Sequence, residues 1–171
     1  CDGDSSSCTE IINYNLHSGQ NLIGIPLNLG ENNNLNSVFS ELLPDNLLSI
    51  TKGGYSSIYT DDGWMGSIST INEKSGYWVW VDEAQEFYIT AFEIINPIYD
   101  LHIGSNLVSY PNKEGLSIAD ALCEYVNGEI LAVLGEGISA VYDTNIGWTG
   151  SLTVFERGNG YWIQTSQDIE G

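Results

Sequence analysis

The sequence predicts an α+β fold built from two tandem, similar, mostly antiparallel β units, each with one short helix. The stretch LHSGQNLIGIP at 16–26 returns 85 positions later, at 101–111, as LHIGSNLVSYP. A second block, GWMGSI at 63–68 with GYWV at 76–79, returns 84 positions later. Two blocks in the same order at nearly the same spacing indicate one unit built twice. The predicted parts are a linker at residues 1–9, a first unit at 10–95 and a second unit at 96–171.

Composition limits the partners of this chain. Of the 171 residues, 42% are hydrophobic, and five Trp and ten Tyr supply ample material for a core. Asp and Glu number 23 against four Lys and Arg, which gives a formal net charge of -19. Nucleic acids and anionic membranes require a basic surface, so both are excluded as expected partners. No apolar run approaches the length of a bilayer span, so membrane insertion is not expected either.

The first eight residues form a polar loop between Cys1 and Cys8. This spacing allows a small disulfide ring, which indicates an oxidising, extracellular or cell-surface compartment. Asp2 and Asp4 are the candidate metal ligands and calcium is the candidate ion, although two carboxylates need further oxygen ligands to form a site. A plain flexible linker is the simpler interpretation, and no other cofactor is expected.

Two hairpins and two helices are expected at matching places in the two units. Apolar runs at 11–16 and 21–26 flank a Gly-containing turn, which is typical of a hairpin, and 99–101 with 106–110 repeat the pattern. A helix is predicted over 35–43, ending at Pro44. The second helix is expected after Ser117 as its cap, with one buried face. That face comprises Ile118, Ala121, Leu122, Tyr125 and Val126, and Cys123 beside it is expected to be a buried small hydrophobe.

Strand signals follow each predicted helix. Strands are expected at 47–51, 55–60, 130–134 and 138–143. In the run at 77–81, Tyr77, Val79 and Val81 alternate with two tryptophans, so the tyrosine face is predicted to be core. A strong strand is predicted over 86–95, and its counterpart in the second unit would begin at 169. The second sheet is therefore expected to lack its last strand and to expose an unpaired edge.

Exposed aromatic and polar side chains give one candidate ligand site. Its members are Trp64, Trp80 and Trp148, which would stack on sugar rings, and Asp61, Asp62 and Asn145, which would accept sugar hydroxyls. The simpler interpretation is that the two tryptophans shared by both copies pin a turn onto the core. His17 and His102 occupy matched places beside a turn, and a structural role is favoured over metal binding because no second ligand accompanies either one.

No catalytic motif is present in the sequence. It contains no nucleophile elbow, phosphate-binding loop, His-Glu-x-x-His motif or paired-cysteine metal spacing. Asp61 and Asp62 are the candidate pair of glycosidase carboxylates, but adjacent carboxylates in a turn are usually solvated. We therefore do not expect an enzyme.

The pattern G-x-N-L-I-G-x-P, a helix, G-W-x-G-S-L and G-Y-W resembles tandem modules of large secreted proteins from marine and other environmental bacteria. Those modules are usually written G-W-N-L-I-S-x-P with P-G-K-G-Y-W. Here Gln20 and Ser105 stand where Trp is common, and residues 73–75 and 157–159 replace the P-G-K run. Residues 1–8 resemble the end of a D-x-C-G-V-C-G-G-D-x-S-S-C array. The resemblance implies a secreted, modular protein and no particular activity.

These observations predict a non-catalytic extracellular module with a structural or adhesive role in a surface or filament-forming protein. Self-association by strand addition is the expected partner chemistry, with residues 9–16 of a neighbour as one candidate donor for the free edge. The alternative is a carbohydrate-binding module that takes a glycan through the tryptophan and carboxylate side chains named above.

Overall fold

The fold class corrects the sequence-based expectation. The computed structural model describes residues 9–95, 97–122 and 128–170. It is mostly β, with 53% strand and 7% helix in four antiparallel sheets, so the α+β prediction is wrong. The predicted roles of Cys1, Cys8, Asp2, Asp4 and Cys123 lie outside the described residues.

The helices are too short to form a layer of their own. The first, α1 (Leu35–Val38), follows a 3-10 turn, η2 (Gly30–Asn32), and ends well before Pro44. The second, α2 (Ile118–Ala121), begins at its predicted cap, because the Ser117 hydroxyl accepts the Asp120 N–H at 3.1 Å. Each helix has only four residues, so the sheets define the architecture.

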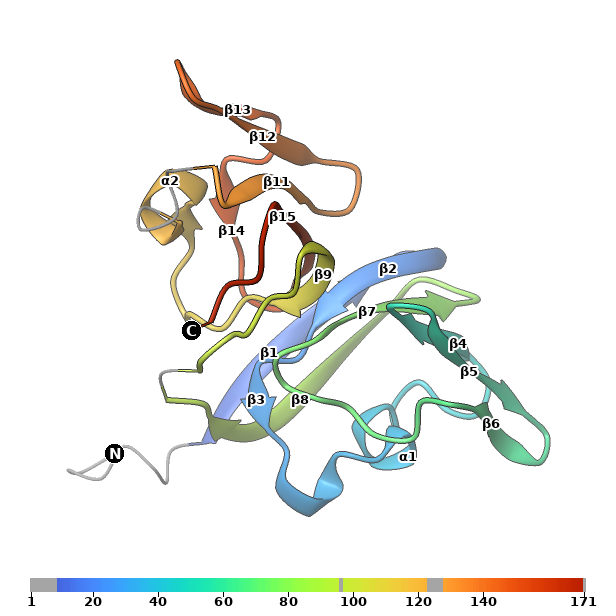
Figure 1. Cartoon of the computed structure of the whole chain (residues 1–171). Helices are drawn as coiled ribbons and strands as arrows, with labels where there is room; N and C mark the ends of the chain where they lie inside the picture. The colour runs from blue at the N-terminus through green and yellow to red at the C-terminus, as the bar shows by residue number, and fades with distance from the viewer. Residues whose placement is uncertain (1–8, 96, 123–127, 171) are drawn as a thin grey trace.

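Two five-stranded sheets have the same order of strands. The first contains, in order, β2 (Gly19–Gly24), β7 (Gly76–Val81), β4 (Leu47–Lys52), β5 (Tyr55–Thr60) and β6 (Gly63–Gly66). The second contains, in order, β9 (Gly104–Ser109), β15 (Gly160–Thr165), β11 (Ile130–Leu134), β12 (Ser139–Asp143) and β13 (Gly147–Gly150). Figure 1 shows the second sheet above the first, with β9 beside β2. The division of the chain at residues 9/10 and 95/96 stays a prediction.

A three-stranded sheet covers the apolar face of the first five-stranded sheet. It has the order β1 (Thr9–Leu16), β8 (Gln85–Glu93), β3 (Leu27–Asn28). Phe87 and Ile89 of β8 are buried in the same cluster as Tyr77 and Val79 of β7. The second five-stranded sheet is accompanied only by the short pair β10 (Leu116–Ser117) and β14 (Val154–Phe155), within the described residues. The two sheets thus share a topology but differ in their covering layer.

The expected hairpin of β1 and β2 is wrong. These strands pair with β8 and β7, respectively, so the chain crosses from one sheet to another at the corner between them. Asn21 stabilises the corner: its side-chain oxygen accepts the His17 N–H at 2.9 Å, and its amide donates to the His17 carbonyl at 2.8 Å. Asn106 and His102 form the same pair of hydrogen bonds, at 3.0 and 2.8 Å. Alternation identified the strands correctly but carries no information about which sheet each one joins.

The prediction that the tyrosine face of residues 77–81 belongs to the core is confirmed. On β7 the side chains of Tyr77, Val79 and Val81 are buried, whereas Trp78 is half-buried and Trp80 is 47% exposed. β15 repeats the burial pattern, with Tyr161 and Ile163 in the core. The buried side chains of β7 and β15 therefore form part of the apolar face of their sheets, and a second layer has to cover that face.

The edges of the two five-stranded sheets meet through paired, matched contacts. We call two residues matched when they occupy equivalent places in the two strand orders, 83 to 85 positions apart in the sequence. The Gly24 N–H donates to the Gly158 carbonyl at 2.8 Å, and the matched Ser109 N–H donates to the Lys74 carbonyl at 3.0 Å. A Cβ added at Gly24 would lie 2.6 Å from the Ser109 Cβ. The two halves are therefore related by an approximate twofold axis. Their close contact requires a residue without a side chain at Gly24.

One contact breaks the approximate twofold relation. Glu136, in the turn between β11 and β12, holds His17 Nε2 with one carboxylate oxygen at 2.5 Å and the Leu22 N–H with the other at 2.8 Å. His17 Nδ1 lies 2.8 Å from the Ser18 carbonyl, so both ring nitrogens face oxygens that accept hydrogen bonds. These partners, Glu136 first, raise the pKa of His17. The imidazolium form is therefore favoured in the folded chain.

A second ionic contact joins β1 to loops of the second half. The Lys113 ammonium pairs with Glu10 at 2.6 Å and with Glu93 at 3.0 Å, and Arg157 reaches Glu10 at 3.4 Å. The hydrogen bond from Lys113 is the main reason that the pKa of Glu10 is lowered. Two of the four cationic side chains are therefore occupied by carboxylates at this contact.

Replacing Gly24 by alanine is expected to lower the free energy of unfolding by about 1–3 kcal/mol, because the new methyl group would overlap the Ser109 side chain and the Asn159 carbonyl. Urea unfolding monitored by circular dichroism measures the change. Gly135→Ala is the matched control, since its Cβ would meet mainly side-chain atoms of Ile138 at 3.1 Å and beyond. Equal urea midpoints for Gly24→Ala and wild type would contradict the close approach of the two sheets.

Glu136→Gln is expected to lower the pKa of His17 toward its ordinary value of about 6.5. Because the folded-state pKa is raised, the contact stabilises the fold fully below about pH 6.5 and ceases to do so as pH rises through that raised pKa. NMR titration of the imidazole resonances measures the shift. Glu129→Gln, which alters a carboxylate bonded to Gln167, is the control and should leave the His17 titration in place.

Candidate functional site

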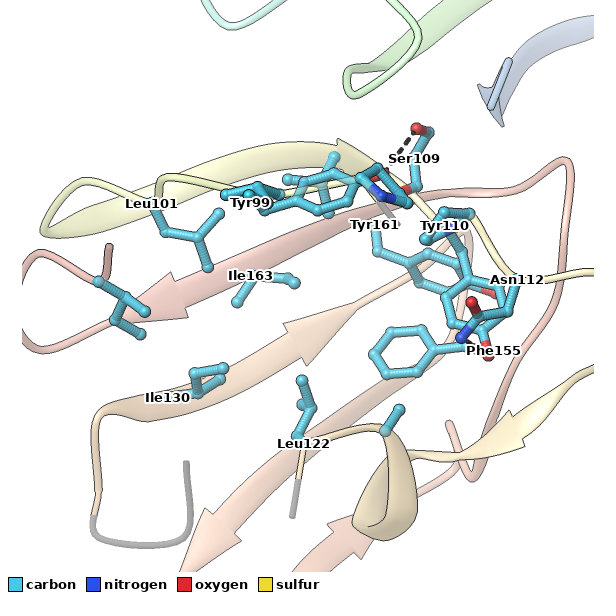
Figure 2. Close-up of a pocket in the computed structure, with 16 residues that line it drawn as sticks. Tyr99, Leu101, Ser109, Tyr110, Asn112, Leu122, Ile130, Phe155, Tyr161 and Ile163 are labelled. Carbon is cyan, nitrogen blue, oxygen red and sulfur yellow. Dashed lines mark hydrogen bonds between the residues drawn. The ribbon is translucent and has the colours of Figure 1, made fainter. Parts of the chain in front are cut away.

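An apolar groove in the second half is the main candidate site. It encloses a cavity of about 430 Å³. Figure 2 shows aliphatic and aromatic side chains lining it from β9, β11, β15 and the segments that precede β9 and follow it. The lining residues are Pro97, Ile98, Tyr99, Leu101, Val108, Ser109, Tyr110, Pro111, Asn112, Ala121, Leu122, Ile130, Phe155, Tyr161, Ile163 and Ile169.

The groove lies at the position that β8 fills in the first half. There, β8 runs between β1 and β3. The two sides of the groove, residues 97–101 and 110–112, match residues 12–16 and 25–27. Leu101 and Ile169 form an isolated bridge, with hydrogen bonds of 2.9 and 2.8 Å, that matches the pairing of Leu16 with Gln85. Apart from this bridge, no strand of the described residues lies between the two sides of the groove.

Aromatic rings form one end of the groove. Phe155 stacks on Tyr110 with ring centroids 5.2 Å apart and meets the edge of Tyr161 at 4.8 Å. In the first half, Phe87 of β8 stacks on Tyr14, which matches Tyr99 of the groove, at 4.8 Å and lies 6.0 Å from Phe39. The residue matched to Phe39 is Leu122, which fills less space. An apolar side chain entering the groove would therefore find rings ready for contact.

The polar atoms around the groove already have partners. Tyr99 donates from its hydroxyl to the Ser109 carbonyl at 2.9 Å, as Tyr14 does to the Gly24 carbonyl at 2.8 Å. Burial raises the pKa of Tyr99, so its hydroxyl stays protonated at neutral pH. The Tyr110 hydroxyl donates to the Glu114 carbonyl at 3.2 Å. None of the described lining side chains is an acid or a base at neutral pH, so the groove offers apolar contact and strand edges.

The tryptophans of the predicted sugar site are mostly packed. Trp64 on β6 contacts the first core and meets the edge of Tyr59 at 5.3 Å, and its buried indole N–H has no hydrogen-bond partner among the described residues. Trp148 on β13 contacts the second core and meets Tyr142 at 5.4 Å. Both tryptophans fit the simpler interpretation of the sequence, in which these rings anchor a turn to the core. Trp80, 47% exposed on β7, is the accessible one.

The polar members of that predicted site lie in two separate turns. Asp61 and Asp62 are exposed in the turn between β5 and β6, and Asn145 is exposed in the turn between β12 and β13. Asn145 donates its backbone N–H to the Asp143 carboxylate at 2.7 Å. Figure 1 shows these two turns at opposite ends of the molecule. The structure therefore does not gather the six predicted residues into one surface.

Within residues 9–95, 97–122 and 128–170, no three His, Cys, Asp or Glu side chains come together in a way that could hold a metal ion. None of the helices in that part of the chain is long and apolar enough to cross a membrane. The groove itself was not predicted from the sequence.

No protein-family model, curated protein or solved structure matches this chain. Inference about function therefore starts from the geometry of the groove and from the contrast between the two halves.

Leu122→Phe is expected to raise the free energy of unfolding by about 0.5–2 kcal/mol, because the ring would fill part of the groove as Phe39 does in the first half. Phe39→Leu is the reciprocal change, and it should lower the free energy of unfolding by about 1 kcal/mol or more, since Phe39 is fully buried. Urea unfolding of both variants provides the measurement. A loss of stability in Leu122→Phe would show that the groove cannot receive a ring.

Proposed function

We propose that this chain is a non-catalytic structural module that joins to a neighbouring module by strand addition, with the groove between residues 97–101 and 110–112 as the acceptor. The observation that carries the proposal is the match between this groove and the place of β8 in the first half. An incoming strand would gain backbone hydrogen bonds along the groove and bury apolar side chains in it.

The first half indicates what an incoming strand should look like. Along β8, Phe87 and Ile89 are buried while Tyr88 is exposed, so alternate side chains enter the core. A donor strand for the second half needs apolar residues at alternate positions, with a ring near Tyr99 and Leu122, which match the two aromatic neighbours of Phe87. Burial of one ring and one aliphatic side chain contributes about 1.5–3 kcal/mol each before the cost of ordering the segment.

The donor expected from the sequence, residues 9–16 of a neighbour, is wrong. That segment is β1, and all eight of its residues pair with β8 of the same chain. The donor we propose is instead a segment with the alternation of β8, supplied by the neighbouring module.

An extracellular location in a surface or filament-forming protein is part of the same proposal. Its support is the acidic composition, with a formal net charge of -19, and the resemblance to modules of secreted bacterial proteins. The carbohydrate-binding alternative has less support, because Trp64 and Trp148 pack on separate cores.

A synthetic peptide with the sequence of residues 85–93 is expected to bind the protein, because it carries the pattern that fills the matched place in the first half. Fluorescence anisotropy of a labelled peptide measures the affinity. The control peptide carries Phe87→Ser and Ile89→Ser and should bind at least tenfold more weakly, a change of about 1.4 kcal/mol. Equal binding of the two peptides would contradict the proposal.

The protein side of the same experiment uses Leu122→Trp, which places a large ring in the groove. This variant should bind the first peptide at least tenfold more weakly, and Leu122→Phe should give an intermediate loss. Sedimentation velocity of the protein alone tests assembly: larger species are expected, and excess peptide should dissociate them. Larger species that persist with peptide bound would show that assembly uses another surface.

A further inference from the structure

A second cavity, of about 570 Å³, lies where the two halves meet. Two chain cations, Lys52 and Lys74, line it together with His102 and the outer edge of β9 around Leu107. Asp100 contributes one carboxylate to the lining. We call this cavity the lysine pocket, and it is independent of the apolar groove described above.

The lysine pocket has a matched counterpart on the other side of the approximate twofold relation. That counterpart is a cavity lined by His17, Leu22, Glu136 and the matched neighbours of the lysine-pocket residues. In it, the Glu136 carboxylate bridges His17 Nε2 and the Leu22 N–H, at 2.5 and 2.8 Å. We call this cavity the glutamate pocket, because its own glutamate fills it.

The two pockets share one backbone scaffold. Asn21 and Asn106 hold the matched histidine corners with hydrogen bonds that differ by 0.1 Å or less, at 2.9 and 2.8 Å in one and 3.0 and 2.8 Å in the other. The histidine rings are also placed alike: Nδ1 lies 2.8 Å from the Ser18 carbonyl for His17, and 2.9 Å from the Ile103 carbonyl for His102. His102 therefore turns Nε2 away from the corner, as His17 does.

The backbone donor is repeated as well. β9 is the last strand of its sheet, and its Ser109 N–H points outward to the Lys74 carbonyl. Because N–H directions alternate along a strand, the Leu107 N–H, two residues earlier, points to the same outer side. The matched Leu22 N–H is the one that Glu136 holds.

The two pockets differ at the position that supplies the acid. The residue matched to Glu136 is Gly53, in the turn between β4 and β5. Gly53 lines the lysine pocket, and a Cβ added there would meet no atom within 4 Å, so this turn places no side chain in the pocket and has room for one at its first atom. The lysine pocket thus has the receptor atoms of the glutamate pocket without the acid that binds them.

Charge points to the same occupant. Of the four Lys and Arg residues in the chain, Lys113 and Arg157 pair with Glu10, whereas Lys52 and Lys74 line the lysine pocket. The Lys52 ammonium lies 5.7 Å from the Tyr77 ring centroid, and burial lowers its pKa. The lining of the lysine pocket holds two lysines against the one carboxylate of Asp100, an excess of one positive charge in a chain with 23 acidic residues, and an anion would neutralise that excess.

We propose that the lysine pocket binds a carboxylate group, with one oxygen on the Leu107 N–H, the other at His102 Nε2, and the ammonium groups of Lys52 and Lys74 beside it. Glu136 in the glutamate pocket is the internal template for this geometry. The template residue stands in a Gly-Glu-Gly turn, so the ligand class is a carboxylate side chain on a tight turn or a small free carboxylate of the same shape.

NMR titration of the whole chain, labelled with ¹⁵N, tests the proposal with the capped tripeptide acetyl-Gly-Glu-Gly-amide. The Leu107 amide and the His102 ring should shift and saturate, while the Leu22 amide stays in place because Glu136 holds it. The acetyl-Gly-Gln-Gly-amide control should leave both sites unchanged. Acetate is the second arm: tighter binding of the peptide assigns the natural source to an acidic side chain, and equal binding assigns it to a free carboxylate.

Two variants connect the response to the pocket. Lys74→Met should weaken tripeptide binding several-fold, since it removes one charge. Gly53→Glu should abolish the response and move the Leu107 amide in the absence of ligand, because its own carboxylate would enter the pocket. Gly53 has φ of 52°, so Gly53→Asp, which adopts that conformation more readily, is the second variant if the first fails to fold.

Three outcomes would overturn the proposal. One is the absence of a saturable shift at Leu107 with either carboxylate. Another is an equal response to chloride or phosphate at the same concentration, which would indicate a general cationic surface. The third is tripeptide binding that Gly53→Glu and Lys74→Met leave unchanged. Each of these is separate from the peptide experiment on the apolar groove, so the failure of one proposal does not decide the other.

Discussion

A β-sheet with one apolar face is stable in water only when a second layer covers that face, and this requirement organises the whole chain. β7 and β15 each present a buried row that begins with a tyrosine, Tyr77 or Tyr161. In the first half, the sheet of β1, β8 and β3 covers that row. In the second half, the matched place of β8 is an apolar groove. The candidate function follows from a difference in covering layer between two sheets with the same strand order.

The edges of the sheets pose the second problem, because an edge strand presents unpaired N–H and C=O groups. Here β2 and β9 are the edge strands where the two halves meet. The edge of β2 bonds to Gly158, in the turn before β15, and the edge of β9 bonds to Lys74, in the turn before β7. The contact requires a very close approach, which Gly24 permits. The outward N–H groups of Leu22 and Leu107 lie two residues before these contacts, which Gly24 and Ser109 make. One is held by Glu136, and the other lies in the lysine pocket.

Local pattern predicted the strands well because burial on one face imposes a period of two. Residues 77–81 show this directly, since the predicted core positions are the buried ones. The same pattern misassigned β1 and β2 as a hairpin, because alternation does not encode which partner a strand chooses. The helix at 35–43 was overestimated for a related reason: Phe39 and Leu42 are buried at helix-like spacing, yet the chain turns after Val38 to bring them into the core.

The two pockets were beyond reach of the sequence for a different reason. The match between Glu136 and Gly53 is hidden by a local change of spacing, since strand pairing places these residues 83 positions apart while the flanking blocks are 84 or 85 apart. His17 and Glu136 are 119 residues apart, so only the folded chain brings them together. The two sheets share a strand order, and the residue in the matched turn, Glu136 or Gly53, decides whether a carboxylate of the chain itself reaches the neighbouring backbone donor. The hydrogen bonds of the histidine corners are common to both pockets, whereas the side chains around them differ, and these side chains give each pocket its charge.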